Sequence, residues 1–322
     1  MEDDQTNTGV AEPPAEAKTG SARTATGAER ASRNGSGRLS GSESQKSQGP
    51  PKTVWREYFE SAVVTVIMAL FGMTFIVQAV KVPTGSMQNT ITIGDHLLVN
   101  KFIFAPGPSL PFLPMREIRR GDIIVFKYPG NPHNRERDES DPNNTPYKTN
   151  YVKRVIGLPG DHVEVRGTRV FINGEPLPEH RVTAEDPGDG APQDDLRHNA
   201  PLQILDNPPP KGEGPYTVYY SAKTRLAPNE SADSTSLSDF HYAVNGKEAV
   251  IPPDHYFVMG DNRDNSSDSR AWGFVPRELV IGRAMFVYWS YDESAPPSGG
   301  FFGPLIDFFT NTRWSRTGTL VK

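Results

Sequence analysis

Ser86 is the candidate nucleophile of this sequence. It lies in the segment 83–87 (PTGSM), where glycine permits a tight backbone and the close approach of a substrate. Thr84 adds a second hydroxyl beside it. A serine in a proline- and glycine-rich loop is also an ordinary turn residue, so this segment indicates a nucleophile only together with a base that activates it.

Lys153 is the candidate base, and it lies in an expected β-strand over 151–158 (YVKRVIGL). Side chains alternate along a strand, so one of the adjacent cations Lys153 and Arg154 must face inward unless the strand twists at a sheet edge. An ammonium held against apolar surface loses hydration, which lowers its pKa and favours the neutral amine. A neutral lysine can take a proton from serine. The alternative is an edge-strand lysine whose side chain reaches water.

The third segment, 260–276 (GDNRDNSSDSRAWGFVP), is dense in short polar side chains that hydrogen-bond to the backbone and to each other. Its aromatic residues and its last proline favour a packed loop over a flexible linker. Within it Asp268 and Arg270 could form an ion pair, and Ser266 could orient an amine. The segment therefore predicts a rigid polar loop.

An apolar run over 61–80 precedes these segments and contains no ionisable residue. As a helix rising about 1.5 Å per residue it would span roughly 30 Å, the thickness of a bilayer core. A buried core helix usually has a clearer polar stripe, and a cleavable signal peptide starts nearer the N-terminus. We therefore expect a transmembrane helix within 53–81. Ser86 follows the run by six residues, so it should lie within about 20 Å of the bilayer face.

Residues 1–52 are rich in small and polar side chains and have few bulky apolar ones, which predicts a disordered tail. Lys46, Lys52 and Arg56 precede the apolar run, and positive residues favour the cytoplasmic side of a membrane. We expect the tail in the cytoplasm and the rest of the chain outside.

After the span, β-branched and aromatic runs separated by turn signals predict a mainly β domain over 82–173 and 250–292. The expected strands are 122–128, 151–158, 162–172, 255–260 and 280–289. The polar stretch 174–249 is interpreted as an inserted subdomain, with one strand near 216–220. In the C-terminal segment 293–322, the apolar part 301–314 is too short to span a bilayer. It would either lie on the membrane surface or pack onto the domain.

Composition excludes several function classes. The net charge of −5 gives no electrostatic reason to bind nucleic acid. The absence of cysteine excludes a cysteine nucleophile, cysteine-ligated zinc and disulfides.

Four segments together resemble the bacterial type I signal peptidases, also called leader peptidases. In chain order they are 83–91 (PTGSMQNTI), 94–101 (GDHLLVNK), 153–161 (KRVIGLPGD) and 260–276. Their order and their position after an apolar span are similar to that family over about residues 61–290. The resemblance implies a signal-peptidase-like antiparallel β catalytic domain with an inserted β subdomain, preceded by one transmembrane helix.

The resemblance also implies roles for the polar residues. Ser86 would be the nucleophile and Lys153 the general base, a Ser-Lys form of serine hydrolase catalysis. The hydroxyl of Thr84 and the backbone N–H of Ser86 would form the oxyanion hole, and Ser266 would hold the lysine amine. Three further positions would support the site: Arg154, Asp268 and Arg270.

A membrane-bound serine endopeptidase that removes signal peptides from secreted precursors is therefore the implied function. It would cut after small residues, in sites of the Ala-X-Ala type, without a metal or organic cofactor. Its partners would be secretory precursors and the lipid bilayer, with no nucleic acid. Its place would be the bacterial inner membrane, crossed once, with the catalytic domain on the extracytoplasmic side.

Two residues of the nucleophile loop depart from the family pattern. Gln88 and Asn89 stand where the family commonly has an acidic residue and a proline, which leaves the stiffness of this loop and its fit to substrate open.

Two rival functions are left open. One is a non-catalytic, membrane-tethered binding or assembly protein. Another is a histidine-dependent hydrolase, since three histidines each follow an aspartate: His96, His162 and His255. Neighbours on a strand face opposite ways, however, and give no relay geometry.

Overall fold

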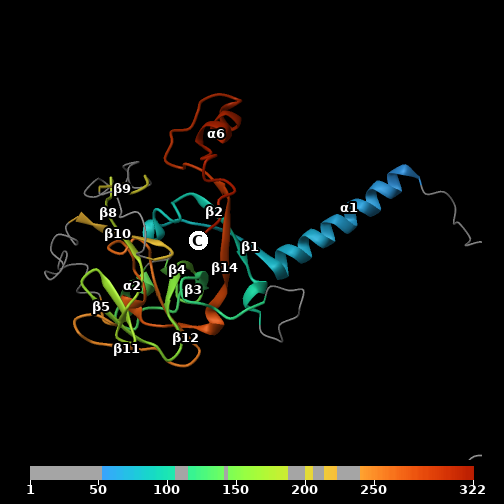
Figure 1. Ribbon diagram of the computed structural model, residues 1–322. Coiled ribbons are helices and arrows are strands. Elements are labelled where there is room, and N and C mark those ends of the chain that lie inside the picture. Colours follow the sequence, from blue (N-terminus) through green and yellow to red (C-terminus); the bar gives the residue numbers. More distant parts are fainter. Residues whose placement is uncertain (1–52, 106–114, 141–143, 188–199, 206–213, 223–239) are drawn as a thin grey trace, which may run out of the picture. The chain divides into compact units, whose positions relative to one another are not determined.

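The computed structural model describes residues 53–105, 115–140, 144–187, 200–205, 214–222 and 240–322 (Figure 1). The prediction of a disordered tail over 1–52 lies outside these residues.

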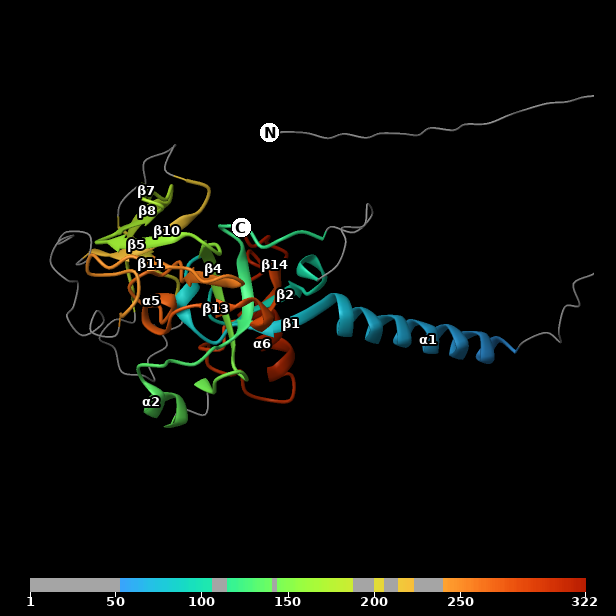
Figure 2. The ribbon, with the colours of Figure 1, turned by 90° about the horizontal axis from the view of Figure 1, so that it is seen from below.

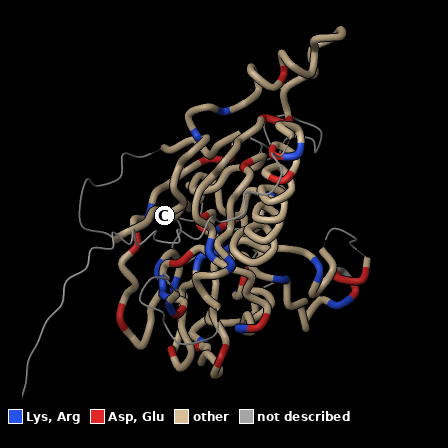
Figure 3. The backbone as a smooth tube through the Cα atoms, turned by 90° about the vertical axis from the view of Figure 1, so that its right-hand side faces the viewer, with Lys and Arg blue, Asp and Glu red and all other residues tan. Residues whose placement is uncertain are grey.

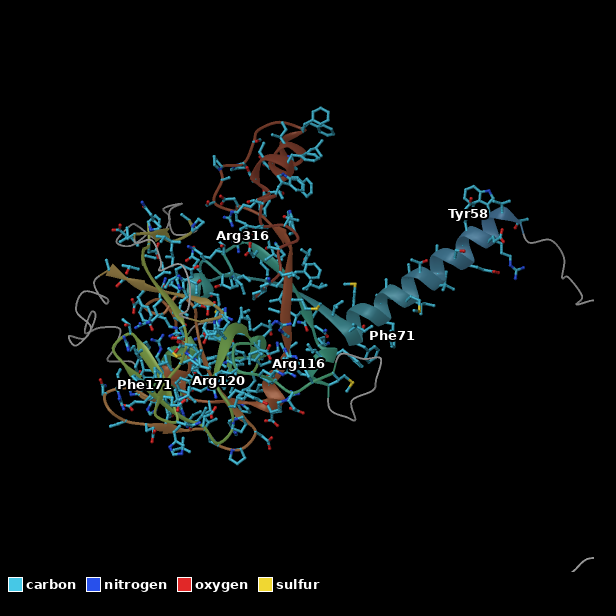
Figure 4. All side chains as sticks on the ribbon, viewed as in Figure 1. Tyr58, Phe71, Arg116, Arg120, Phe171 and Arg316 are labelled. Carbon is cyan, nitrogen blue, oxygen red and sulfur yellow. The ribbon has the colours of Figure 1, made fainter. Side chains whose placement is uncertain are left out.

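Helix α1 (Val54–Phe71) continues through a π-helical turn (Gly72–Ile76) and projects away from the sheets (Figures 1 and 2). It has 23 residues, of which an 18-residue window has a mean hydropathy of 2.0, and none of its residues is buried. At about 1.5 Å per residue this length is sufficient to cross a bilayer core. Figure 4 shows the labelled Tyr58 and Phe71 pointing outward from the helix. Figure 3 colours the charged residues, which on α1 fall within its first turns and leave the rest of the helix uncharged.

The apolar run was predicted to remain helical to residue 80, and this boundary is wrong. The helix ends at Ile76, and Val77–Lys81 form strand β1, which pairs antiparallel with β2 (Asp95–Asn100). Apolar residues suit either conformation, and pairing with a partner strand decides between them.

The central sheet has seven strands in the order β1-β2-β14-β3-β4-β12-β13, and every neighbouring pair is antiparallel. Beyond β1 and β2, its strands are β3 (Ile123–Lys127), β4 (Asn150–Gly157), β12 (His255–Met259), β13 (Val275–Pro276) and β14 (Val280–Ser290). The sheet confirms the predicted mainly β class and the expected strands at β3, β4, β12 and β14. Strand β2 was not among the expected strands.

Strand β3 shows why the middle of this sheet is deeply buried. Ile124 and Phe126 belong to one apolar cluster and Ile123 and Val125 to another. Because alternate residues point to opposite faces, apolar side chains cover both faces of the sheet here. Strand β4 pairs with β3 on one side and with β12 on the other, so its polar residues lie in an interior strand.

The predicted strand over 162–172 is a hairpin of β5 (His162–Arg166) and β6 (Arg169–Ile172), because the chain turns at Gly167, which has a positive φ. These strands form a four-stranded sheet with two further strands, β7 (Glu175–Pro176) and β11 (Ala249–Val250).

The inserted stretch carries more strands than the single one expected. Besides β7, it contains a three-stranded sheet in the order β10-β8-β9, in which β8 and β10 run parallel. The bounds are β8 (His180–Glu185), β9 (Gln203–Ile204) and β10 (Thr217–Ser221). Strand β10 confirms the expected strand near 216–220.

Short helices connect these strands. They are the 3-10 turns η2 (Gly85–Met87), η3 (Phe102–Phe104) and η6 (Arg277–Leu279), and the α-helices α2 (Arg135–Ser140), α5 (Ser269–Trp272) and α6 (Gly303–Asn311).

Helix α6 keeps most of its apolar side chains exposed. Phe301 and Phe302 just before it are 93% and 66% exposed, and Leu305 and Phe309 on the helix are each 57% exposed. Phe308, which approaches Trp289 with 6.0 Å between ring centroids, is also 41% exposed. The end of the segment nevertheless packs onto the domain, because the indole N–H of Trp289 donates to the hydroxyl of Thr312 at 3.1 Å and Tyr291 forms a β-bridge with Thr312. The segment therefore packs onto the domain at its C-terminal end, while α6 leaves apolar side chains exposed.

Candidate active site

Ser86 lies in the 3-10 turn η2, between strands β1 and β2. The next residue, Met87, is buried in an apolar cluster with Ile91 and Leu97, which fixes the turn to the domain. Backbone N–H groups in the first turn of a helix have no partner within that helix. The N–H of Ser86 is such a group, so the turn offers a hydrogen-bond donor next to its own hydroxyl.

Lys153 meets Ser86 across the fold. Its Nζ lies 2.5 Å from the Oγ of Ser86, although the two residues are 67 positions apart. The side chain of Lys153 is buried, and this burial lowers its pKa to about 8. Asp268 and Asp261 act against the burial and raise the pKa, whereas Arg270 adds to the lowering. A lysine with a pKa near 8 is a usable general base close to neutral pH.

The edge-strand alternative for Lys153 is wrong, because β4 is an interior strand. Both adjacent cations are buried, with Lys153 3% and Arg154 1% exposed. They are accommodated differently: Lys153 can become neutral, whereas Arg154 keeps its charge and has a bidentate partner in Asp261. The two hydrogen bonds of that pair are 2.6 and 2.8 Å long.

Asp261 is a site residue that the sequence analysis did not single out. Its side chain also accepts a 2.6 Å hydrogen bond from the hydroxyl of Thr90, which follows the nucleophile turn. It therefore connects the strand of the lysine to the loop of the serine. The signal in the sequence was its position in the polar segment 260–276, but its partner Arg154 is 107 positions away.

Asp268 and Arg270 form the expected ion pair, with Nη2 of the arginine 2.8 Å from the carboxylate. Asp268 also accepts a hydrogen bond from the backbone N–H of Gly260 at 3.1 Å. Burial alone would raise the pKa of Asp268, but the charge and hydrogen bonds of Arg270, with that backbone bond, hold it below its usual value. The pair thus fixes the polar loop and keeps a negative charge near Lys153.

Ser266 is buried beside Gly260, where a Cβ added to the glycine would collide with the Ser266 hydroxyl and the Ser86 carbonyl oxygen. The Ser266 hydroxyl contributes to the lowered pKa of Asp268, although it makes no hydrogen bond of strict geometry within the described residues. Its role in holding the lysine amine stays a prediction.

Thr84 lies directly before the 3-10 turn, and its side chain is exposed and makes no capping hydrogen bond to that turn. The exposed hydroxyl is two residues from Ser86. Its role in an oxyanion hole also stays a prediction.

The three histidines of the rival hydrolase have other partners. His96 stacks on Trp289 with 4.8 Å between ring centroids, and His162 pairs with Glu248 at 3.0 Å. His255 contacts a backbone oxygen of its own turn. In the part of the chain that the structure describes, no group of three or more His, Asp or Glu side chains is arranged to hold a metal.

Comparison with known proteins identifies a family that this chain resembles. A family model described as signal peptidase, peptidase S26, matches residues 55–289. A signal peptidase I of Pseudomonas fluorescens is 34% identical over 253 residues, covering 74% of this chain and 73% of the relative. A signal peptidase I of Pseudomonas aeruginosa is 32% identical over the same shares. A probable signal peptidase I-2 of Synechocystis is 30% identical, covering 76% and 78%.

Proposed function

The chain belongs to the signal peptidase family, peptidase S26, and from this premise we propose that it is a serine endopeptidase that removes signal peptides with a Ser86–Lys153 dyad. The observation that carries the proposal is the 2.5 Å approach of a buried lysine amine, with its pKa lowered to about 8, to the hydroxyl of Ser86.

Acylation begins when the neutral amine of Lys153 takes the proton of Ser86 while Oγ attacks the scissile carbonyl carbon. The backbone N–H of Ser86 and the hydroxyl of Thr84 stabilise the negative charge on the carbonyl oxygen. The resulting lysine ammonium gives its proton to the leaving amine as the peptide bond breaks, which leaves an ester on Ser86. Water then attacks the ester, Lys153 accepts the water proton and returns it to Oγ, and the cleaved signal peptide leaves.

The substrate is a secretory precursor that enters as an extended chain. Strand β1 is an edge of the central sheet and leads within five residues to Ser86, so a precursor segment can pair with its free side. Selection of small residues before the cut, in Ala-X-Ala sites, follows from close approach of the substrate backbone to the nucleophile turn.

Helix α1 holds the enzyme in the membrane as its single span. Its length and the mean hydropathy of 2.0 over an 18-residue window support this role. The orientation follows the positive residues before the span, which favour a cytoplasmic N-terminus and an extracytoplasmic catalytic domain in the bacterial inner membrane.

The test is cleavage of a precursor peptide whose leader ends in Ala-X-Ala by the detergent-solubilised full chain and by its Ser86→Ala variant. Cleavage at that bond by the parent chain alone is the expected result. Equal cleavage by both would exclude Ser86 as the nucleophile. Binding of the peptide by both without cleavage would favour the rival, a membrane-tethered binding protein.

A further inference from the structure

Gln88 and Asn89, the two departures from the family pattern, bind the inserted stretch. The side-chain amide of Gln88 donates to the carbonyl oxygen of Ala200 at 2.7 Å. The carboxamide of Asn89 donates to the carbonyl oxygen of Leu202 at 2.9 Å and accepts from the N–H of Leu202 at 2.7 Å. Asn89 therefore pairs with Leu202 much as one strand residue pairs with another, and this fixes both partners.

The segment that they bind belongs to the three-stranded sheet. Leu202 is buried in an apolar cluster with Val182 and Ala184 of β8 and Tyr219 of β10. Leu202 also directly precedes β9, which pairs with the end of β8. The hydrogen bonds of Gln88 and Asn89 thus attach the nucleophile loop to the body of the β8-β9-β10 sheet.

The same sheet binds the polar loop on the other side of the site. The backbone N–H of Tyr219 donates to the carbonyl oxygen of Asp261 at 2.8 Å, and the N–H of Arg263 donates back to Tyr219 at 2.9 Å. The N–H of Ser221 donates to the carboxylate of Asp264 at 2.7 Å. These three bonds hold β10 along residues 261–264.

A buried ion pair strengthens this second attachment. Arg263 and Glu179, which lies just before β8, are both fully buried, and Nη1 of the arginine lies 2.9 Å from the glutamate. The hydroxyl of Tyr216 donates to the same carboxylate at 3.1 Å. Breaking one member of a buried pair leaves an uncompensated charge, so this link resists separation.

The two attachments meet at the nucleophile. Asn262, between the loop residues held by Tyr219, donates its backbone N–H to the carbonyl oxygen of Ser86 at 3.1 Å and its side-chain amide to Gly85 at 3.2 Å. The sheet therefore holds the loop of Ser86 both directly and through Asn262.

We propose that the inserted β8-β9-β10 sheet is a positioning element of the catalytic site, and that Gln88 and Asn89 are the positioning residues through which it fixes Ser86 against Lys153. This inference rests on the proposed roles of Ser86 and Lys153. In this chain the side-chain hydrogen bonds take the place of a proline's stiffness. A displacement of about 1 Å between reacting groups can slow a reaction about 100-fold, so such fixing has kinetic consequences.

The experiment compares Gln88→Met and Asn89→Ala with Gln203→Met, a matched control on the exposed face of β9. Full-length enzyme in detergent is assayed for kcat, KM and the pH dependence of kcat with one precursor peptide, and Ser86→Ala is assayed in parallel. Positioning predicts that kcat falls about 10- to 100-fold in the first two variants. The KM of both variants should equal that of the parent chain. The apparent pKa in the pH dependence of kcat, which is near 8 because Lys153 is buried, should also be the same in the variants and the parent.

Each other outcome has a definite meaning. If kcat of both variants matches that of Gln203→Met while Ser86→Ala is inactive, the positioning role is overturned and the dyad stands. A rise in KM without a fall in kcat also overturns it, because these residues would then act on substrate binding. Activity in Ser86→Ala would overturn the proposed function itself. Circular dichroism of each variant establishes that the protein assayed is folded.

Discussion

The guanidinium of Arg154 donates two hydrogen bonds, 2.6 and 2.8 Å long, to the carboxylate of Asp261, and both side chains are buried. Arg154 and Lys153 are adjacent on one strand, so without this pair a buried guanidinium would lie beside the lysine with no counter-charge from Asp261. Asp261 neutralises one cation and also raises the pKa of the other. The ion pair therefore influences both the stability of the sheet and the basicity of the lysine.

Asp261→Asn tests this double role. The substitution leaves Arg154 buried without its counter-charge, so the free energy of unfolding should fall by about 3 to 5 kcal/mol. Because the aspartate raises the pKa of Lys153, its removal should move the acid limb of any remaining activity to lower pH. Chemical denaturation and a pH–rate profile measure the two effects. A limb that moves to higher pH would contradict the electrostatic account.

Gln88 illustrates what the sequence could and could not predict. Ser86, Lys153 and the Asp268–Arg270 pair stand in short motifs whose residue types carry the signal. The partners of Gln88 and Asn89 carry no such signal. They are backbone groups about 112 positions away, and a residue of any type provides such groups. Long-range contact, rather than local pattern, decides these bonds.

The same dependence on long-range contacts explains why the predicted helix boundary was wrong and why some strands were not expected. Val77–Lys81 is apolar enough to extend the helix and becomes a strand only because β2 is available to pair with it. Strand β9 has two residues, and the parallel pairing of β8 with β10 requires the chain to return from a distance. Neither leaves a periodic signal of useful length.

The pH dependence of kcat/KM should show a single acid limb with an apparent pKa of about 8. Lys153 must be neutral to accept the proton of Ser86, so activity is lost as the pH falls through this value and reaches a plateau above it. Burial is the main reason that the limb lies below the range of an exposed lysine. Initial rates with a precursor peptide between pH 5 and pH 10 measure it. A rate that keeps rising to the alkaline end would show that the amine is not desolvated.

Lys153→Met should abolish cleavage and at the same time stabilise the folded protein. In the folded chain the lysine has a pKa of about 8, compared with 10.5 for the ordinary side chain, so the unfolded state binds more protons between these values. Stability of the parent chain therefore rises with pH across this interval. Below about pH 8 the lysine should reduce the free energy of unfolding by about 3 kcal/mol.

The measurement is the difference in unfolding free energy between Lys153→Met and the parent at several pH values. We expect the variant to be more stable at pH 7 and the difference to vanish above about pH 10.5, where both states hold a neutral amine. A difference that is independent of pH would indicate a packing effect and not the titration of this lysine.

Gly260→Ala should inactivate the enzyme and destabilise it. A Cβ at this position would collide with the carbonyl oxygen of Ser86 and the side chain of Ser266, so the nucleophile turn and the polar loop would have to separate. Overpacking of this kind costs about 1 to 3 kcal/mol. Gly299→Ala is the matched control, because a Cβ there meets nothing within 4 Å. Thermal unfolding and peptide cleavage are compared for both, and full activity of Gly260→Ala would refute the close packing of these loops.

Helix α6 should lie in the bilayer interface when the full chain is reconstituted into lipid vesicles. Large exposed apolar side chains of the described residues concentrate in two places, helix α1 and the segment 301–314. The single carboxylate in this segment, Asp307, accepts hydrogen bonds from the backbone N–H of Ser298 and so turns back to its own loop. An amphipathic aromatic helix on a domain already tethered by α1 is suited to the headgroup boundary.

The chain contains no cysteine, so single-cysteine variants can carry a nitroxide at chosen depths. Phe302→Cys reports on α6, Val64→Cys on the middle of α1, and Glu175→Cys on the exposed strand β7. The label at position 302 should be accessible to oxygen and protected from a water-soluble nickel chelate. Its accessibility to each reagent should lie between that of the deep label at position 64 and that of the aqueous label at position 175. Equal access of the chelate to positions 302 and 175 would mean that α6 faces water. Exclusion of both reagents from position 302 would mean that α6 is covered by protein, since bilayer permits oxygen to enter.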